Sequence, residues 1–289
     1  MGAETPASGS ETSVPETTSR PEIAADGSAA AMDVAAAGND VSAPAVDGLP
    51  DSPPDATPDA AVAPADAPPG MMGRPSCAGK SYRVCEDFES GDVDRSVWTT
   101  NAQGGSSLKV DGVRAAGGSK ALHVIHSGSA DGEVSIRVTK IFPMPKNSFF
   151  ARAYVYQDLP QLPENFNYFW TVGEGKRYAL GPSIDMPPVV RWIYQPDHFT
   201  KKSTLRVPTA RWACWEWEFR GDANESRVWV DGAELPELHI TNQTRPGPWV
   251  IPRWDRLDIG QQAPRPQAGG PFHVWFDEIA IHTERIGCT

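Results

Sequence analysis

Short runs of β-branched and aromatic residues recur along this chain from about Tyr82 onward, and they constrain the fold more than any other feature. Clusters of Gly, Pro, Asn and Asp, which favour turns, separate the runs, and helix signals are almost absent. Examples are KALHVIH, EVSIRVTKIF, FFARAYVY, NYFWTV, VVRWIY, SRVWVDG and FHVWFDEIAIH. Many short strands at this spacing predict an all-β fold, an antiparallel jelly-roll sandwich of two sheets.

The composition divides the chain of 289 residues into two parts. Residues 1–75 contain no Trp, Tyr, Phe or Cys and consist mostly of Ala, Pro, Asp, Gly, Ser and Thr. Such a segment cannot bury enough apolar surface to offset the entropy lost on ordering. We therefore predict a disordered, Pro/Ala/Asp-rich tether over residues 1–75 and one jelly-roll domain over residues 76–289.

The acidic charge of the chain belongs to the tether. Residues 1–75 hold twelve acidic and two basic side chains, a balance of −10, and the formal net charge of the whole chain is −11. The remaining residues, with 25 acids and 24 bases, are close to neutral. The folded part lacks the basic excess expected of a nucleic-acid binder, so no nucleic-acid partner is predicted.

The tether points to an extracellular location of the folded part. No run reaches the length of a membrane span, and the first residues lack the apolar core of a signal peptide. The tether nevertheless resembles the spacer of a secreted or surface-anchored bacterial lipoprotein, with Met1 in place of a removed signal and lipidated cysteine. We therefore expect the protein to be a monomer in an oxidising compartment.

Four cysteines, an even number, all lie in the folded part. Their spacing matches no zinc pattern, so two structural disulfides are the better interpretation. Pairing Cys77 with Cys85 and Cys214 with Cys288 suits the order of the chain, and the other two connectivities stay open.

Alternation along a strand assigns side chains to faces. In FFARAYVYQ, the small apolar row of Ala151, Ala153 and Val155 belongs in the core. The opposite row then stands on an outer sheet surface, and it comprises Arg152, Tyr154 and Tyr156.

The stretch RWACWEWEF concentrates aromatic residues and carboxylates. Its continuous apolar face predicts a core strand, and this face consists of Ala213, Trp215, Trp217 and Phe219. The other face carries Trp212, Cys214, Glu216 and Glu218. The two glutamates would lie roughly 6–7 Å apart, which could suit a glycosidase pair. A solvated or cross-strand-paired polar face is the favoured alternative, because the E-x-D-x-x-E strand of jelly-roll glucanases is missing.

In VWFDEIAIH, alternation places Asp277 on one face with Trp275, Ile279 and Ile281. A buried carboxylate must be paired or bind a metal. A calcium ion, with Glu89 of CEDFESG as a second ligand, and a salt bridge to Arg or Lys are both open.

Several motifs together resemble a known family. CEDFESGDVDRSVW resembles its opening strand and FFARAYVYQ its central strand, while PTARWACWEWEFRGDANESRVWVDGAELP and VWFDEIAIHTERIGC match its C-terminal half in order and spacing. The family is that of the fungal cellulose-induced secreted proteins, concanavalin-A-like jelly rolls related to glucuronan and alginate lyases. The resemblance covers about residues 77–289.

The resemblance implies a disulfide between Cys214 and Cys288 and a structural Ca²⁺ ion. The implied metal ligands are Glu89, Asp277 and backbone oxygens near AAGGSKAL, such as that of Gly117. Lys120 stands where the family has a small polar ligand, which weakens the site.

The lyases among these relatives break uronate glycans by β-elimination, which needs a group that neutralises the carboxylate, a base and an acid. The family's cleft His and Arg are not reproduced in GKRYALGPSID. Arg177 and Tyr178 are the nearest functional groups there, and Ala179 falls at the position of the family arginine. Gln262 replaces a family glutamate.

A different set of residues could still supply the chemistry. Arg152 would neutralise the carboxylate, Tyr154 or Tyr156 would act as base and acid, and Gln262 would lie across from them. Substrate-binding residues would be Tyr168, Trp170, Arg177, Tyr178 and Arg191, while His198 is interpreted as a surface histidine.

The same set suits a lectin groove, because Arg binds carboxylates and aromatic rings stack on sugars. We therefore expect recognition of an extracellular polysaccharide, with uronate lyase activity as the sharper hypothesis. A non-catalytic carbohydrate-binding or adhesive surface module is the alternative.

Overall fold

The computed structural model describes residue 77 and residues 79–129, 132–158, 166–185, 187–195, 197–244, 250–263, 266 and 269–288. The predicted tether, residues 1–75, lies outside this range. The described residues form two antiparallel sheets and two short 3-10 helices, η1 (Pro145–Asn147) and η2 (Pro236–Leu238). The predicted all-β, two-sheet sandwich is therefore confirmed. Neither helix of the described part is long and apolar enough to cross a membrane.

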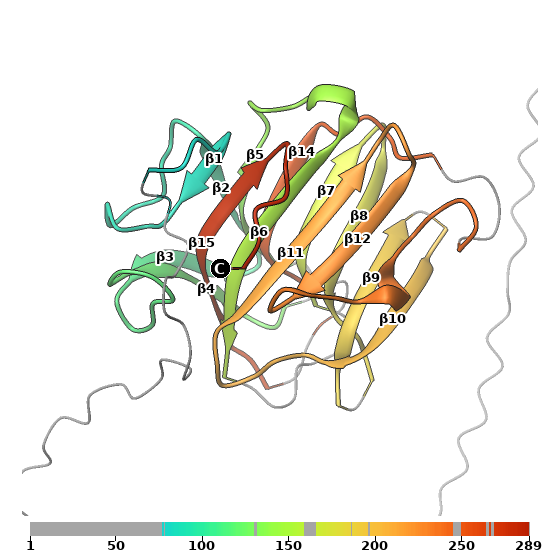
Figure 1. The fold of residues 1–289 in the computed structure, drawn as a ribbon. Coiled ribbons are helices and arrows are strands. Elements are labelled where there is room, and N and C mark those ends of the chain that lie inside the picture. The colour runs from blue at the N-terminus through green and yellow to red at the C-terminus, as the bar shows by residue number, and fades with distance from the viewer. Residues whose placement is uncertain are drawn as a thin grey trace, which may run out of the picture. The chain divides into compact units, whose positions relative to one another are not determined.

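The first sheet contains the strand of the RWACWEWEF stretch and the last strand of the chain (Figure 1). Its order is β13 (Ala233–Glu234), β12 (Glu225–Val230), β11 (Ala213–Arg220), β6 (Phe149–Gln157), β15 (Phe272–His282), β4 (Ala121–His126) and β3 (Ser107–Asp111), and β1 (Val84–Glu86) also pairs with β15.

The second sheet lies behind β11, β6 and β15 in Figure 1. Its order is β10 (Phe199–Arg206), β9 (Val189–Gln195), β8 (Lys176–Pro182), β7 (Asn167–Gly173), β14 (Arg256–Gln262), β5 (Glu133–Val138) and β2 (Trp98–Ala102).

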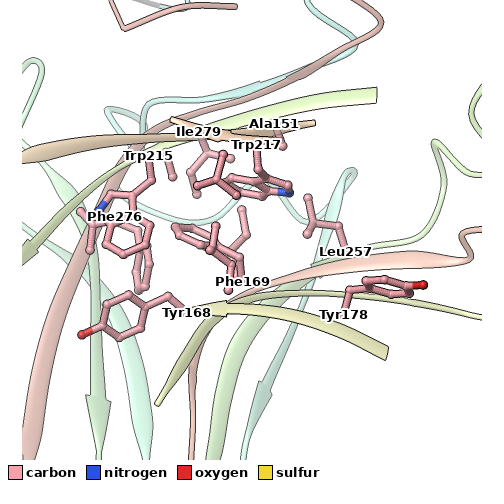
Figure 2. Close-up of a cluster of buried hydrophobic side chains, with 14 of the residues drawn as sticks. Ala151, Tyr168, Phe169, Tyr178, Trp215, Trp217, Leu257, Phe276 and Ile279 are labelled. Atoms are coloured by element: carbon pink, nitrogen blue, oxygen red, sulfur yellow. The ribbon is translucent and has the colours of Figure 1, made fainter. Parts of the chain in front are cut away.

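Aromatic side chains fill the space between the sheets, as the alternation predicts. Trp215 and Trp217 of β11 point toward the second sheet and contact Phe169 of β7, with ring centroids 5.9 and 4.3 Å apart. Figure 2 shows these rings together with Phe276 of the first sheet and Leu257 of the second. Burying this apolar surface is the main term that stabilises the sandwich. Trp215 and Trp217 of the RWACWEWEF stretch are thus core residues.

A β-bulge in β15 changes the face of its last residues. The register with β6 shifts between Asp277 and Ala280, and Glu278 has a φ of 49°. Asp277 consequently stays on the outer face, while Ile279 and Ile281 belong to the core between the sheets. The predicted common face of Asp277, Ile279 and Ile281 is wrong, because one extra residue in a strand reverses the alternation.

A second irregularity lies in β14. Its register with β7 shifts between Ile259 and Gln262, and a Cβ atom at Gly260 would lie 2.0 Å from the carbonyl oxygen of Val134. Only glycine is tolerated where two backbones approach this closely. Across this shift, Tyr168 of β7 lies in the core with Phe169, whereas Trp170 belongs to neither core cluster. Simple alternation would place Tyr168 and Trp170 on one face of the strand, and this expectation is wrong.

Both predicted disulfides are present. Cys77 pairs with Cys85, and Cys214 of β11 pairs with Cys288, with Cα atoms 5.5 and 5.8 Å apart. The second bond holds the segment after β15, residues 283–288, against the outer face of the first sheet.

Candidate functional site

The predicted catalytic row of β6 is covered by this C-terminal segment. Arg152 is 0% exposed, and its guanidinium donates to the carbonyl oxygens of Glu278 and Gly287 at 3.2–3.3 Å. The hydroxyl group of Tyr154 donates to the carbonyl oxygen of Cys288 at 2.8 Å. Tyr156 is buried among Trp212, Trp275 and Arg114. The row occupies the outer face as predicted, yet it is not open to a substrate, because alternation does not reveal what covers a face.

The two glutamates of the RWACWEWEF stretch also stabilise the fold. Glu216 is 0% exposed, and its carboxylate accepts hydrogen bonds from the amides of Ile286 and Gly287 and from Arg285. Glu218 is buried beside Arg227, 3.5 Å away, and burial raises its pKa. The paired polar face is thus the better description, and a glycosidase pair is not supported.

Two tyrosines predicted to bind substrate lie in the core. Tyr168 is 0% exposed, and its hydroxyl group donates to Gln157 of the first sheet. Tyr178 is 1% exposed and packs against Trp192, Phe219 and Trp254. Both rings point away from the outer surface of the second sheet (Figure 2). Neither can act as base or acid on a bound polysaccharide.

The outer face of the second sheet gathers the remaining predicted residues, which come from four adjacent strands. Arg177 of β8 donates to Gln262 Oε1 of β14 at 3.2 Å. The same oxygen accepts a hydrogen bond from Asn167 Nδ2 of β7 at 2.7 Å. Asn167 Oδ1 in turn accepts a hydrogen bond from Arg191 of β9 at 2.7 Å. We call the chain Arg177–Gln262–Asn167–Arg191 the polar network. Gln262 therefore lies across from Arg177 and Arg191, and not from Arg152 as predicted.

The polar network has a fixed direction. A guanidinium can only donate, so Asn167 must present its oxygen to Arg191 and its amide nitrogen to Gln262. Gln262 then uses its oxygen for Asn167 and Arg177, which leaves its amide group as a donor. The network consequently uses its amide oxygens internally, and its partly exposed members, Arg177 and Gln262, present N–H groups at the surface.

Ion pairs border the polar network on one side. Asp258 of β14 is 0% exposed and accepts a hydrogen bond from Arg137 of β5 at 2.5 Å, with Arg256 Nε 3.0 Å from its other oxygen. Arg137 also contacts Glu133 at 3.3 Å. The register places these residues on the outer face together with the polar network. Four arginines against two carboxylates on β5, β14, β7, β8 and β9 give this face an excess of two positive charges.

Burial affects the cations of the network. It lowers the pKa of Arg191 to about 10 and also lowers the pKa of Arg177. Both side chains remain charged at neutral pH, but they are partly stripped of water, so an anion bound there would interact strongly. The guanidinium of Arg177 lies 4.9 Å above the ring of Trp170, which is 1% exposed. Trp170 therefore supports Arg177 and is not an open stacking surface as predicted.

The predicted calcium ligands converge on the loop before β4, but they do not fit a calcium site. The carboxylate of Glu89 accepts hydrogen bonds from Ser119 and from the amide of Lys120, whose ammonium group donates to the carbonyl oxygen of Glu89. Asp277 accepts amide hydrogen bonds from Ala116, Gly117 and Glu278 at 2.7–3.0 Å.

Calcium needs six to eight oxygen ligands around one point. Here N–H groups occupy the carboxylate oxygens and a lysine ammonium takes the position of a ligand. No group of three or more acidic, His or Cys side chains suited to a metal occurs in the described part of the chain. The adjacency of β1 and β15, which the calcium prediction required, is nevertheless observed.

Sequence reasoning missed Asn167 of the polar network and the ion pairs that border it. Asn167, Arg137, Asp258 and Arg256 were not singled out, although alternation in EVSIRV and RLDIG places the last three opposite core residues. A search for charged residues that share the outer face of adjacent strands would have found them.

Comparison with known proteins supports the fold. No protein-family model and no curated protein matches the chain. Among solved structures, the cellulose-induced protein Cip1 matches with a TM-score of 0.61 and 20% identity, over 71% of this chain and all of that one. The chain therefore shares the fold of Cip1, as the motifs predicted.

Two lyases are also similar to the chain. One is an endo-β-1,4-glucuronan lyase from the fungus Trichoderma reesei, with a TM-score of 0.49 and 16% identity over 71% of this chain and 96% of the other. The other is the alginate lyase vAL-1 from a Chlorella virus, with a TM-score of 0.47 and 10% identity over 70% of this chain and all of that one.

Proposed function

We propose that the domain binds an acidic extracellular polysaccharide on the outer face of the second sheet. The observation that carries the proposal is the direction of the polar network, in which the partly exposed Arg177 and Gln262 present N–H donors and the buried Arg191 fixes the orientation of Asn167. A ligand for such a surface must be rich in acceptors, and a uronate carboxylate binds guanidinium groups in bidentate fashion. The excess of two positive charges on this face favours the same ligands.

The two structural disulfides agree with an extracellular role, because such bonds persist in oxidising compartments. Binding without cleavage is the function that this face supports best. β-Elimination needs a base and an acid near the neutralised carboxylate. The described strand positions on the outer face of the second sheet include no Tyr or His, and His198 is exposed in the β9–β10 turn.

The test is binding of oligoglucuronate, oligoalginate and oligogalacturonate, compared with cello-oligosaccharides, by isothermal titration calorimetry. We expect binding of the acidic oligosaccharides only, weakened by salt. Arg191→Gln should weaken it about tenfold or more, since it removes a positive charge and the charge-assisted hydrogen bond, worth about 1.5–3 kcal/mol, that orients Asn167. The matched control, Arg83→Gln, removes an exposed arginine near β1 and should leave binding unchanged.

The same samples are followed for the ultraviolet absorbance of unsaturated uronates. Binding without new absorbance supports a binding module, whereas new absorbance that Arg191→Gln abolishes would establish lyase activity at this face. Equal affinity of the wild type and Arg191→Gln for the acidic glycans would contradict the proposed site.

A further inference from the structure

Two histidines face each other on the outer side of the first sheet, opposite the proposed polysaccharide face. Asp111 Oδ2 of β3 lies 2.7 Å from Nδ1 of His123 on β4, and Nε2 of His123 lies 2.8 Å from Nδ1 of His273 on β15. The three strands are neighbours in the sheet, so their backbone pairing fixes this spacing. Neither the sequence motifs nor the proposed function uses these residues.

The carboxylate of Asp111 determines which nitrogens donate along the hydrogen-bonded series Asp111–His123–His273. An ionised carboxylate only accepts, so Nδ1 of His123 must carry a proton. Burial lowers the pKa of His123, so its ring is neutral near pH 7 and its Nε2 is an acceptor. His273 must then donate from Nδ1, which leaves the lone pair of His273 on Nε2.

In this series His123 is buried and tightly packed, whereas His273 reaches the surface. His123 is 5% exposed and stacks on Trp275 with ring centroids 4.2 Å apart. His273 stacks on the same indole at 6.0 Å and is partly exposed. Its Nε2 has no hydrogen-bond partner among the residues that the structure describes.

The charged neighbours restrict the ligand that could reach this nitrogen. Lys109, whose side chain is 56% exposed, lies 3.1 Å from Asp111, and Arg114 lies over Trp275 and Tyr156 and pairs with Asp158. Asp111 and Asp158 neutralise these two cations, so the charged neighbours add no net attraction for an ion. An uncharged hydroxyl group suits the lone pair of His273 Nε2, because it can donate a hydrogen bond to an imidazole nitrogen.

We propose that Asp111, His123 and His273 form a proton relay that serves a second ligand site, where His273 Nε2 accepts a hydrogen bond from a saccharide hydroxyl group. The arrangement follows the logic of a catalytic triad, in which a buried carboxylate fixes the tautomer of an imidazole. Here a second imidazole extends the relay to the surface. The site is separate from the polar network, because it lies on the other sheet.

The first test is nitrogen-15 NMR of the imidazole rings in the full chain. The neutral ring of His273 is expected to carry its proton on Nδ1. Asp111→Asn should disturb this preference, because an amide can present a donor to His123. The exposed His198 is the internal control, and Asp111→Asn should leave its spectrum unchanged. A proton on Nε2 of His273 in the wild type would overturn the relay.

The second test titrates the protein with cellohexaose and with hexaglucuronate while the imidazole signals are recorded. Saturable shifts of the His273 signals, lost in His273→Phe and kept in Arg191→Gln, are expected. If the His273 signals still shift in Arg191→Gln, this site is separate from the polysaccharide face, whatever the binding test at that face shows. Absence of any His273 shift with both oligosaccharides at millimolar concentration would overturn the ligand site.

Discussion

At the scale of single residues, Glu216 shows how a buried carboxylate can organise a surface. It accepts three hydrogen bonds from the C-terminal segment, two from the amides of Ile286 and Gly287 and one from Arg285. Backbone amides have few alternative partners once they are turned toward a sheet. Together with the disulfide of Cys288 and the hydrogen bonds from Arg152 and Tyr154, this one side chain fixes the position of the segment.

Glu216→Ala is expected to destabilise the domain by roughly 2–4 kcal/mol, because two amides and a guanidinium lose a charged acceptor. Urea denaturation measures the change, and Glu234→Ala, an exposed glutamate of β13, is the matched control and should change stability little. Binding of acidic polysaccharides should persist in folded Glu216→Ala. A normal stability with lost binding or activity would instead assign Glu216 a direct functional role.

Two arginines show how far the sequence could predict the site. Alternation correctly places Arg152 on the outer face of its strand, and Arg191 is likewise on the outer face of β9. The sequence does not show that residues 283–288 cover Arg152, since that segment is distant in the chain and has no strand pattern. Arg191 was predicted as a binding residue, and the structure places it in the polar network; its role stays a prediction.

At the scale of elements, the strands and core faces were predictable and the bulges were not. The β11 core face follows directly from its apolar alternation. The bulge in β15 adds one residue that no pattern marks and reverses the side-chain faces beyond it. At the register shift between β14 and β7, the neighbouring residues Tyr168 and Phe169 both lie in the core. The errors in the faces of Ile279 and Tyr168 arise at these two positions.

The two disulfides should contribute unequally to stability, because they close loops of different length. Cys214 and Cys288 are separated by 74 positions, and Cys77 and Cys85 by 8. Loop-closure entropy alone makes the long-range bond worth about 2 kcal/mol more than the short one. We expect Cys214→Ser/Cys288→Ser to lower the denaturation midpoint well beyond Cys77→Ser/Cys85→Ser.

Amide hydrogen exchange provides a second test of the Cys214–Cys288 disulfide. Loss of the Cys214–Cys288 bond should increase exchange at the amides of residues 283–288 and around Arg152 and Tyr154, which this segment covers. Equal destabilisation by the two double variants would contradict the entropic estimate. Unchanged exchange at residues 283–288 would show that the hydrogen bonds of Glu216, Arg152 and Tyr154 hold the segment without the disulfide.

At the scale of the whole domain, the outer faces of the two sheets differ in chemistry. The second sheet presents arginines and amides, whereas the first carries buried aromatic rings, the C-terminal segment and the histidine relay. Beside that segment, Asp277 and Glu278 are both at least 96% buried. Burial raises the pKa of Asp277 to about 8 and that of Glu278 to about 7.

These two carboxyl groups predict an unusual pH dependence of stability. In the unfolded chain they titrate near 3.8 and 4.5, so between about pH 4 and 8 the folded state holds protons that the unfolded state has lost. Their contribution is fully present below pH 4 and is lost as the pH rises through 7 and 8. Buried His123 and His126, whose pKa values are lowered, act in the opposite direction below about pH 6.5.

The expected result is a free energy of unfolding that falls as the pH rises from 6.5 to 8, measured by urea denaturation in EDTA. Asp277→Asn should reduce this slope, because the amide does not titrate, and Asp222→Asn, an exposed aspartate, is the control. The same series in CaCl₂ tests the calcium prediction, since a bound cation would favour the ionised carboxylates and remove the slope. Because amides and the Lys120 ammonium already occupy Glu89 and Asp277, we expect identical curves in both solutions. A calcium-dependent gain in stability that Asp277→Asn abolishes would show instead that the loop before β4 rearranges to hold the ion.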